Sequence, residues 1–290
     1  MLIDRILFRV VCGFGDRHIH KMKIPEDIER KLDIPYGPHG KFNLLDIYFP
    51  KGTSGPLPTI VSVHGGGYVY GSKELYQFYC MDLACRGFTV VNFNYRLVPA
   101  ISFPMPAVET NEVLRWMCEH AEGHFIDLNN VFIVGDSAGA QIASQYATIL
   151  TSKSYADLFG LELPAFRLAA LALNCGMYEK FHEIETALPG LFDDYFGKDP
   201  LLHGDKTNIR KFIDGGFPPT YVASSVNDFL LPCARPMYDL LRKRNVEAVL
   251  RIYGTEAQKD VAHVFHLNLR SETATQCNDA QCEFFRRHVA

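Results

Sequence analysis

Apolar runs alternate with segments of helical spacing along most of the chain. The apolar runs fall at 59–63, 88–93, 131–134, 168–173, 220–225 and 247–253. Several of them are rich in β-branched residues, which is typical of buried strands. Segments with apolar residues three and four positions apart, typical of helices with one buried face, fall at 75–86, 108–117, 141–147, 232–244 and 273–288. Strands that alternate with helices predict an α/β fold, in which a mostly parallel sheet is covered on both faces.

The N-terminal part has a different pattern. Apolar residues at helical spacing within 2–10 predict an amphipathic helix that packs on the body of the protein. Two short β-like runs follow at 31–36 and 42–49. The Gly-Pro-His-Gly sequence at 37–40 predicts a hairpin connection between them.

A segment of another character, 181–216, lies between the strands predicted at 168–173 and 220–225. It mixes aromatic and charged residues, and it is longer than the single crossover helix that two parallel strands need. An insertion at the carboxyl end of a parallel sheet is where lids and substrate pockets are built. A pair of ordinary surface helices fits the composition equally well, so both interpretations stay open.

Composition limits the partners that we expect. Of the 290 residues, 48% are hydrophobic and 21% are charged, with a formal net charge of -4. No run of Lys or Arg is long enough to follow a phosphate backbone, so we expect no nucleic-acid partner. No apolar stretch reaches the ~18 residues of a membrane span. Asp4, Arg5 and Arg9 interrupt the apolar start, which argues against a secretory signal.

The eight cysteines do not predict a metal centre. None of them forms a Cys-x-x-Cys pair or the Cys/His spacing of a zinc site. Several lie inside patterns of buried helix or strand. We therefore expect reduced structural thiols in a cytoplasmic protein.

The most informative stretch joins a strand, a sharp turn and a helix. The run 131–134 leads into Gly-Asp-Ser-Ala-Gly at 135–139, and 141–147 continues as a helix. A serine at such a turn has its hydroxyl exposed above the sheet and the positive end of the helix beneath it. Glycines fit at 135 and 139 because a side chain would collide with the neighbouring strand or helix. The context predicts Ser137 as a nucleophile, although Gly-x-Ser-x-Gly alone also occurs by chance.

A run of glycines follows the strand at 59–63. The sequence His-Gly-Gly-Gly-Tyr at 64–68 exposes backbone N–H groups and lets a substrate approach the main chain closely. Amides aimed at an oxyanion need this arrangement. The Lys and Ser/Thr of a phosphate-binding loop do not follow these glycines. The glycine run could also be a flexible turn without a functional role, and this alternative stays open.

A serine nucleophile needs a base and an acid that orients the base, and on a parallel sheet both should follow later strands. Asp228 follows the strand at 220–225, and His263 follows the strand at 247–253. The order Ser, Asp, His, each beyond its own strand, predicts a triad. His266 competes with His263 as the base, because one helical turn could hold both.

Three motifs together resemble one family. Val-His-Gly-Gly-Gly-Tyr at 63–68, Tyr-Arg-Leu-Val-Pro at 95–99 and Gly-Asp-Ser-Ala-Gly at 135–139 are similar to motifs of the hormone-sensitive lipase family of α/β-hydrolases, the bacterial family IV carboxylesterases. The resemblance covers roughly residues 40–290. It implies a single α/β-hydrolase domain over 1–290 with an eight-stranded sheet. It also implies a helical cap made from about 1–35 and 180–216.

The resemblance also implies roles for individual residues. Ser137 is the expected nucleophile, Asp228 the orienting acid and His263 the base, since the family's His-Gly-Phe triplet fits His-Val-Phe at 263–265. The expected oxyanion donors are the amides of Gly65, Gly66, Gly67 and Ala138, and His64 is expected to brace their loop. An aromatic substrate cleft is expected from Tyr68, Tyr70, Phe181, Phe192, Tyr195 and Phe196. Ala100, Ala140 and Pro232 depart from the family's pattern, but none of them replaces a catalytic group.

The predicted activity is hydrolysis of small to medium carboxylic esters through an acyl-enzyme, with no metal or cofactor required. The expected partner is a small-molecule ester, and a homo-oligomer is possible. An amidase or peptidase would use the same residues. A small-ligand receptor on the same fold and a protein-interaction role also stay open, but the receptor is disfavoured because serine and histidine are both intact.

Overall fold

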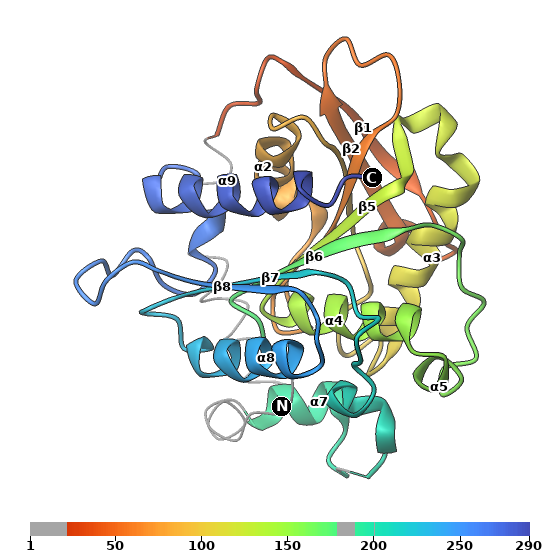
Figure 1. Cartoon of the computed structure of the whole chain (residues 1–290). Helices are drawn as coiled ribbons and strands as arrows, with labels where there is room; N and C mark the ends of the chain where they lie inside the picture. The colour runs from red at the N-terminus through yellow and green to blue at the C-terminus, as the bar shows by residue number, and fades with distance from the viewer. Residues whose placement is uncertain (1–21, 179–188, 200) are drawn as a thin grey trace.

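The computed structural model describes residues 22–178, 189–199 and 201–290. The helix predicted within 2–10 and the aromatic residue Phe181 lie outside the described residues. The described part is built on one twisted sheet with helices on both of its faces (Figure 1).

Eight strands form the sheet, and each of them overlaps one of the predicted runs. They are β1 (Ile28–Pro35), β2 (Leu44–Pro50), β3 (Leu57–Val63), β4 (Thr89–Phe93), β5 (Ile126–Asp136), β6 (Leu168–Asn174), β7 (Thr220–Ser225) and β8 (Ala248–Tyr253). Their order across the sheet is β1-β2-β4-β3-β5-β6-β7-β8. β2 pairs antiparallel with β1 and β4, and the remaining pairs are parallel. The prediction of a mostly parallel, eight-stranded sheet is confirmed.

The long helices divide between the two faces. Helices α2 (Lys73–Ala84) and α9 (Glu272–Arg286) cover one face, and α3 (Met105–His120), α4 (Ala138–Thr151) and α8 (Leu231–Lys243) cover the other (Figure 1). Each face has its own buried core. Phe88, Phe132 and Phe285 belong to the core beneath α2 and α9, and Ile142 and Leu241 to the opposite core.

Shorter elements complete the connections. They are the 3₁₀ turns η2 (Gly40–Asn43), η3 (Glu122–His124) and η6 (Phe265–Leu267) and the one-turn helix α5 (Lys153–Ala156). The predicted hairpin is present, because β1 and β2 pair across the connection that holds η2.

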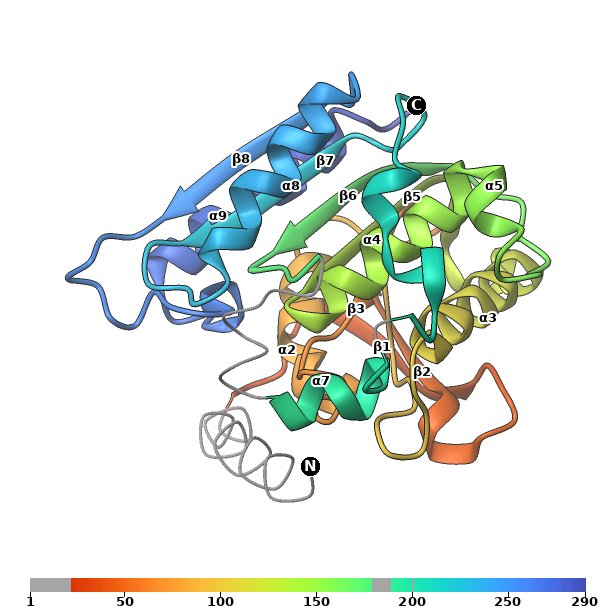
Figure 2. The ribbon, with the colours of Figure 1, turned by 90° about the horizontal axis from the view of Figure 1, so that it is seen from below.

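Residues 189–199 and 201–211, here called the cap segment, occupy part of the predicted insertion. The segment contains α7 (Pro189–Phe196), η4 (Gly204–Thr207) and η5 (Ile209–Lys211), and it lies on the side of the sheet that carries α4 (Figure 2). The predicted N-terminal contribution to a cap is wrong for residues 28–35. They form β1 at the edge of the sheet, because their backbone pairs with residues 44–50 of β2.

The turn between β5 and α4 is closely packed, as the glycine spacing predicts. A Cβ atom at Gly135 would lie 2.4 Å from the carbonyl oxygen of Gly139, within α4. A Cβ atom at Gly139 would lie 2.1 Å from the carbonyl oxygen of Val63, at the end of β3. Both obstacles are backbone atoms, so a side chain at either position would force α4 away from the sheet.

We predict that Gly139→Ala destabilises the protein by about 3 kcal/mol, the upper range for overpacking a rigid site. Thermal unfolding followed by circular dichroism measures the effect. Gly55→Ala is the matched control, because open space surrounds Gly55. Equal unfolding temperatures for the two variants would contradict the close approach of α4 to β3.

Candidate active site

Ser137 lies at the turn between β5 and α4 in an unusual backbone conformation. Its φ is 53° and its ψ is -120°, in a region that costs a non-glycine residue of the order of 1–3 kcal/mol. Two hydrogen bonds hold this conformation. The Ser137 N–H donates to the carbonyl oxygen of Asn174 at 3.1 Å, and the Ser137 carbonyl accepts from the N–H of Met177 at 3.2 Å. The β6 end therefore fixes the serine, whose side chain stays partly accessible.

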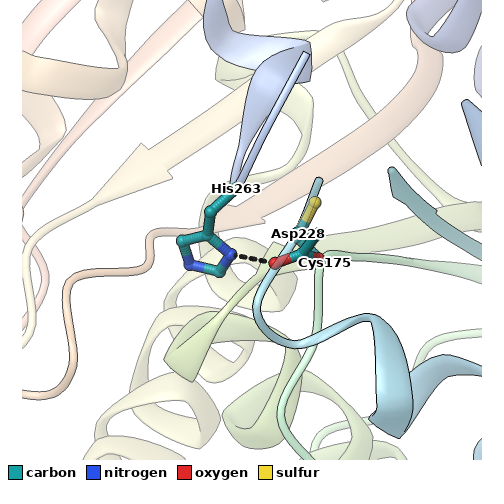
Figure 3. Close-up of side chains that lie close together, drawn as sticks. All are labelled: Cys175, Asp228 and His263. Atoms are coloured by element: carbon teal, nitrogen blue, oxygen red, sulfur yellow. Dashed lines mark hydrogen bonds and ion pairs between the residues drawn. The ribbon is translucent and has the colours of Figure 1, made fainter. Parts of the chain in front are cut away.

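His263 joins the serine to Asp228. The His263 Nε2 lies 3.0 Å from Ser137 Oγ, and its Nδ1 lies 2.7 Å from Asp228 Oδ1. Figure 3 shows the imidazole pointing toward the carboxylate from the loop that follows β8. An ionised carboxylate only accepts hydrogen bonds, so Nδ1 carries the proton and Nε2 is free to accept the serine proton. The structure thus brings together three residues that the sequence separates by 126 and 35 positions.

The environment of Asp228 keeps it ionised. Its Oδ2 accepts from the hydroxyl of Ser224 at 2.6 Å, and its Oδ1 accepts from the N–H of Leu230 at 2.9 Å. Burial alone would raise the pKa of Asp228, but the bonds from His263, Ser224 and Leu230 hold that pKa below its ordinary value. The ring of Phe229, 56% exposed, lies 4.3 Å from the imidazole of His263 and covers one side of it.

His266 does not take part in this arrangement. It is completely buried, and its ring meets Tyr79 edge-on at 5.2 Å. Burial, followed by the nearby charge of His263, lowers the pKa of His266 to about 3, so its ring is neutral. Of the two candidate histidines, His263 is the one that reaches Ser137.

The glycine loop forms a tight turn beside the serine. Gly66 has a φ of +115°, and a Cβ atom there would lie 2.1 Å from the carbonyl oxygen of Tyr70. Gly67 has a φ of 57°. The amides of both residues donate to no acceptor within the described ranges, and the amide of Ala138 belongs to the first turn of α4, where helical amides lack intrahelical partners. These three amides remain available to a ligand.

Gly65 differs from its two neighbours, and its predicted role as an oxyanion donor is wrong. Its N–H already donates to the hydroxyl of Tyr76 at 2.9 Å. Its carbonyl accepts from Nδ1 of His64 at 2.8 Å. Gly65 therefore anchors the loop and has no free amide to offer to an oxyanion.

His64 contacts the loop through backbone and ring. It is completely buried and stacks on Tyr95 with ring centroids 4.1 Å apart. The Tyr95 hydroxyl donates to the carbonyl oxygen of His64 at 2.8 Å. Burial lowers the pKa of His64 to about 4, so the imidazole is neutral. These contacts match the bracing position expected for His64.

The predicted aromatic cleft is wrong in its geometry. Tyr68 and Tyr195 stack with ring centroids 3.6 Å apart, and Phe196 meets Tyr68 edge-on at 5.9 Å. Phe192 stacks on Phe196, and all four side chains are buried. They form a closed aromatic block between α7 and the glycine loop. Rings that pack against each other bury more apolar surface than rings that line an open cleft. Tyr70 is half-buried at the margin of this core.

Sequence reasoning missed Asp136 and Tyr76. Both are buried, and the Tyr76 hydroxyl donates to Asp136 Oδ2 at 2.7 Å. Burial raises the pKa of the Asp136 carboxyl to about 7, against the lowering effects of the Tyr76 bond and of His263. Asp136 fills a variable position of Gly-x-Ser-x-Gly, and Tyr76 looks like an ordinary apolar helix residue. No local signal could have paired them.

Cys175 is also part of the surroundings of Asp228. Within the described residues, Cys175, Asp228 and His263 are the group of three side chains with metal-ligand atoms inside 4.8 Å of one another (Figure 3). Asp228 and His263 already use their facing atoms in the hydrogen bond between them. Burial raises the pKa of the Cys175 thiol well above its ordinary value, which disfavours the thiolate that a metal requires. We therefore assign these three residues to the serine site.

The chain is similar in sequence to several esterases. A family model described as BD-FAE matches residues 45–188. A versiconal hemiacetal acetate esterase of Dothistroma septosporum is 29% identical over 216 residues, which cover 69% of this chain and 65% of the relative. The chain spans between 38% and 65% of the length of three curated relatives that it matches.

Solved structures share the whole architecture. Esterase B from Lactobacillus rhamnosis superposes with a TM-score of 0.91 at 24% identity, covering 100% of this chain and 95% of that one. An esterase from the bacterial hormone-sensitive lipase family superposes with a TM-score of 0.75 at 21% identity, covering 96% and 90%. The eight-stranded sheet and these superpositions show that the chain has the α/β-hydrolase fold. Its glycine and serine motifs lie at the ends of β3 and β5.

No helix within residues 22–178, 189–199 and 201–290 has the length and the apolar character that crossing a bilayer requires.

We predict that Asp136→Asn becomes more stable relative to the wild type as the pH rises from about 4 to about 7. Asp136 has a raised pKa in the folded protein, so between these values the unfolded chain has lost its proton while the folded chain retains it. Stability of the wild type therefore falls as the pH rises through this window, by up to about 4 kcal/mol from this group. The amide that replaces the carboxyl in the variant does not ionise, so it contributes no pH dependence to the stability.

Chemical unfolding of both proteins at pH 4.5, 6 and 8 measures this difference. Asp127→Asn is the matched control at another strand position, where the carboxylate is partly accessible. A wild-type-to-variant difference that stays constant over the three pH values would contradict the raised pKa.

Proposed function

We propose that this chain is a serine carboxylesterase that acts on small esters through an acyl-enzyme. The observation that carries the proposal is the continuous line of hydrogen bonds from Ser137 Oγ through His263 to Asp228. These distances are within the range in which a base accepts a proton from a nucleophile. A receptor that only binds ligands has no use for a buried, ionised Asp228 behind the imidazole.

In the first step, Ser137 Oγ attacks the carbonyl carbon of the ester and its proton passes to Nε2 of His263. The carbonyl oxygen becomes an oxyanion, which the amides of Gly66, Gly67 and Ala138 stabilise. Asp228 holds the imidazole and stabilises its positive charge. The oxyanion then collapses, the alkoxide leaves and takes the proton from His263, and the acyl group remains on Ser137.

In the second step, water attacks the acyl carbon. His263 accepts a proton from this water, the amides of Gly66, Gly67 and Ala138 again stabilise the oxyanion, and the ester bond to Ser137 breaks. Ser137 Oγ regains the proton from His263, and the carboxylic acid leaves. The reaction consumes the ester and one water molecule, and it returns Ser137 and His263 to their starting states.

The acyl group that we propose is short. The aromatic block of Tyr68, Phe192, Tyr195 and Phe196 fills the space next to the glycine loop, which leaves little depth for a long chain. The relative from Dothistroma is named as an acetate esterase. Both observations favour acetyl to butyryl esters.

We predict that Ser137→Ala keeps the fold but lowers turnover of 4-nitrophenyl acetate by about 10⁴-fold or more, because no other group supplies the nucleophile. Labelling by a fluorophosphonate probe should disappear at the same time. His263→Ala should cost a similar factor, and the double variant should be little worse than either, because the residues act as a unit.

The control for this experiment is Ser54→Ala, an exposed serine in the loop before β3, which should retain full turnover and labelling. Undiminished turnover in Ser137→Ala would refute the assignment. Parallel assays with 4-nitroanilide substrates separate an esterase from an amidase that uses the same residues.

We predict that Tyr195→Ala shifts the preference toward longer acyl chains. Removing this ring takes away the partner that stacks on Tyr68 and opens space beside the glycine loop. The ratio of kcat/KM for 4-nitrophenyl octanoate to that for the acetate should rise about tenfold, the range of a few methylene contacts. Phe212→Ala is the control, because its ring packs on Tyr155 instead. An unchanged ratio in Tyr195→Ala would mean that the acyl group lies elsewhere.

A further inference from the structure

Three segments meet at a buried hydrogen-bonded junction beside the nucleophile. Gly65 follows β3, Tyr76 lies on α2, and Asp136 ends β5. The hydroxyl of Tyr76 accepts from the N–H of Gly65 at 2.9 Å and donates to Oδ2 of Asp136 at 2.7 Å. A single phenolic oxygen therefore links the glycine loop to the residue that precedes Ser137.

The backbone is shaped to fit this junction. Strands β3 and β5 pair in parallel with Val63 opposite Gly135, so Gly65 and Asp136 leave the sheet side by side. A Cβ atom at Gly65 would lie 2.5 Å from Asp136 Oδ2 and 2.9 Å from the Asp136 carbonyl oxygen. Only glycine fits there. The absence of a side chain at Gly65 thus lets the Asp136 carboxylate approach, while the amides of Gly66 and Gly67 have no acceptor among the described residues.

We propose that Tyr76 and Asp136 form a positioning pair that fixes the amides of Gly66 and Gly67 relative to Ser137. The pair acts at both ends of the oxyanion site. At one end, the Tyr76 hydroxyl binds the N–H of Gly65, the residue that directly precedes the two glycines with donor amides. At the other, Asp136 is covalently joined to the nucleophile. This role rests on the proposed esterase function and adds two residues to its machinery, neither of which touches the substrate.

The ionisation state of Asp136 changes the strength of the hydrogen bonds at this junction. The titratable groups that act on it are Tyr76 and Cys80 from α2, Tyr95 after β4 and His263 after β8, and none of these carries a permanent positive charge. A hydrogen bond to an ionised acceptor is about twice as strong as a neutral one. The hydrogen bonds that hold the glycine loop are therefore strongest when Asp136 is ionised. Burial raises the pKa of Asp136 to about 7, so the carboxyl changes its ionisation state near neutral pH.

The first test is Tyr76→Phe, which removes the linking oxygen and keeps the ring. We expect kcat for 4-nitrophenyl acetate to fall about tenfold or more, with KM within about twofold, because displaced donors affect the transition state more than substrate binding. Tyr79→Phe is the matched control. Tyr79 is also buried on α2, but its hydroxyl accepts from Gln281 on α9, so its loss should leave kcat unchanged.

The second test is the pH dependence of kcat/KM in Asp136→Asn. In the wild type, log(kcat/KM) should fall more steeply below pH 7 than in the variant, because the wild type takes up a proton at Asp136 in this range. The variant should lose this additional slope, since its amide takes up no proton. A merely structural role for Asp136 would change the stability of the variant without changing this slope.

The outcomes separate the two proposals. Suppose that the wild type turns over the ester. An unchanged kcat in Tyr76→Phe, or equal slopes in the wild type and Asp136→Asn, would then overturn the positioning pair and leave the esterase function intact. An absence of ester turnover and of fluorophosphonate labelling in the wild type would overturn the function and the positioning role together.

Discussion

The parallel pairing of β3, β5, β6, β7 and β8 is the constraint on which the site depends. Parallel strands end at the same edge of a sheet, so loops far apart in the sequence begin next to one another. The glycine loop, Ser137, Asp228 and His263 each follow one of these strands. The approach of α4 to β3 at Gly139 then fixes the height of the serine above that edge. A change in register of one pair would separate groups that now lie 2.7 and 3.0 Å apart.

Two buried carboxylates near the serine have opposite electrostatic environments. Asp228 accepts hydrogen bonds from the Ser224 hydroxyl, the His263 imidazole and the Leu230 amide, and these outweigh the effect of burial on its pKa. Asp136 has the hydroxyl of Tyr76 as its closest partner, and burial dominates. One carboxylate is thus ionised over the whole neutral range, while the other changes its charge within it. Neighbouring positions on one sheet edge can therefore provide a constant charge and a titrating one.

The cap segment is joined to the glycine loop by aromatic packing. The stack of Tyr68 on Tyr195 places α7 directly against the residue that follows Gly67. Phe103 adds a backbone bond, since its N–H donates to the carbonyl oxygen of Tyr195 at 2.9 Å. The hydroxyl of Tyr68 donates to Gln141 on α4 at 3.2 Å, so the block also contacts the helix that begins after Ser137. The cap segment, the glycine loop and helix α4 therefore pack against one another through this aromatic block.

The sequence by itself determined the strands, the helices and the order Ser137, Asp228, His263, because these depend on apolar spacing and on motifs that are local in the chain. It also located both glycine turns. Tertiary structure placed His263 against Ser137, as its triplet had indicated, and buried His266. Tertiary structure alone removed Gly65 from the free amides, closed the aromatic residues into a block and paired Asp136 with Tyr76. Each of these outcomes depends on which hydrogen-bonding or packing partner a residue meets. Those partners come from distant segments, and the fold is what brings them together.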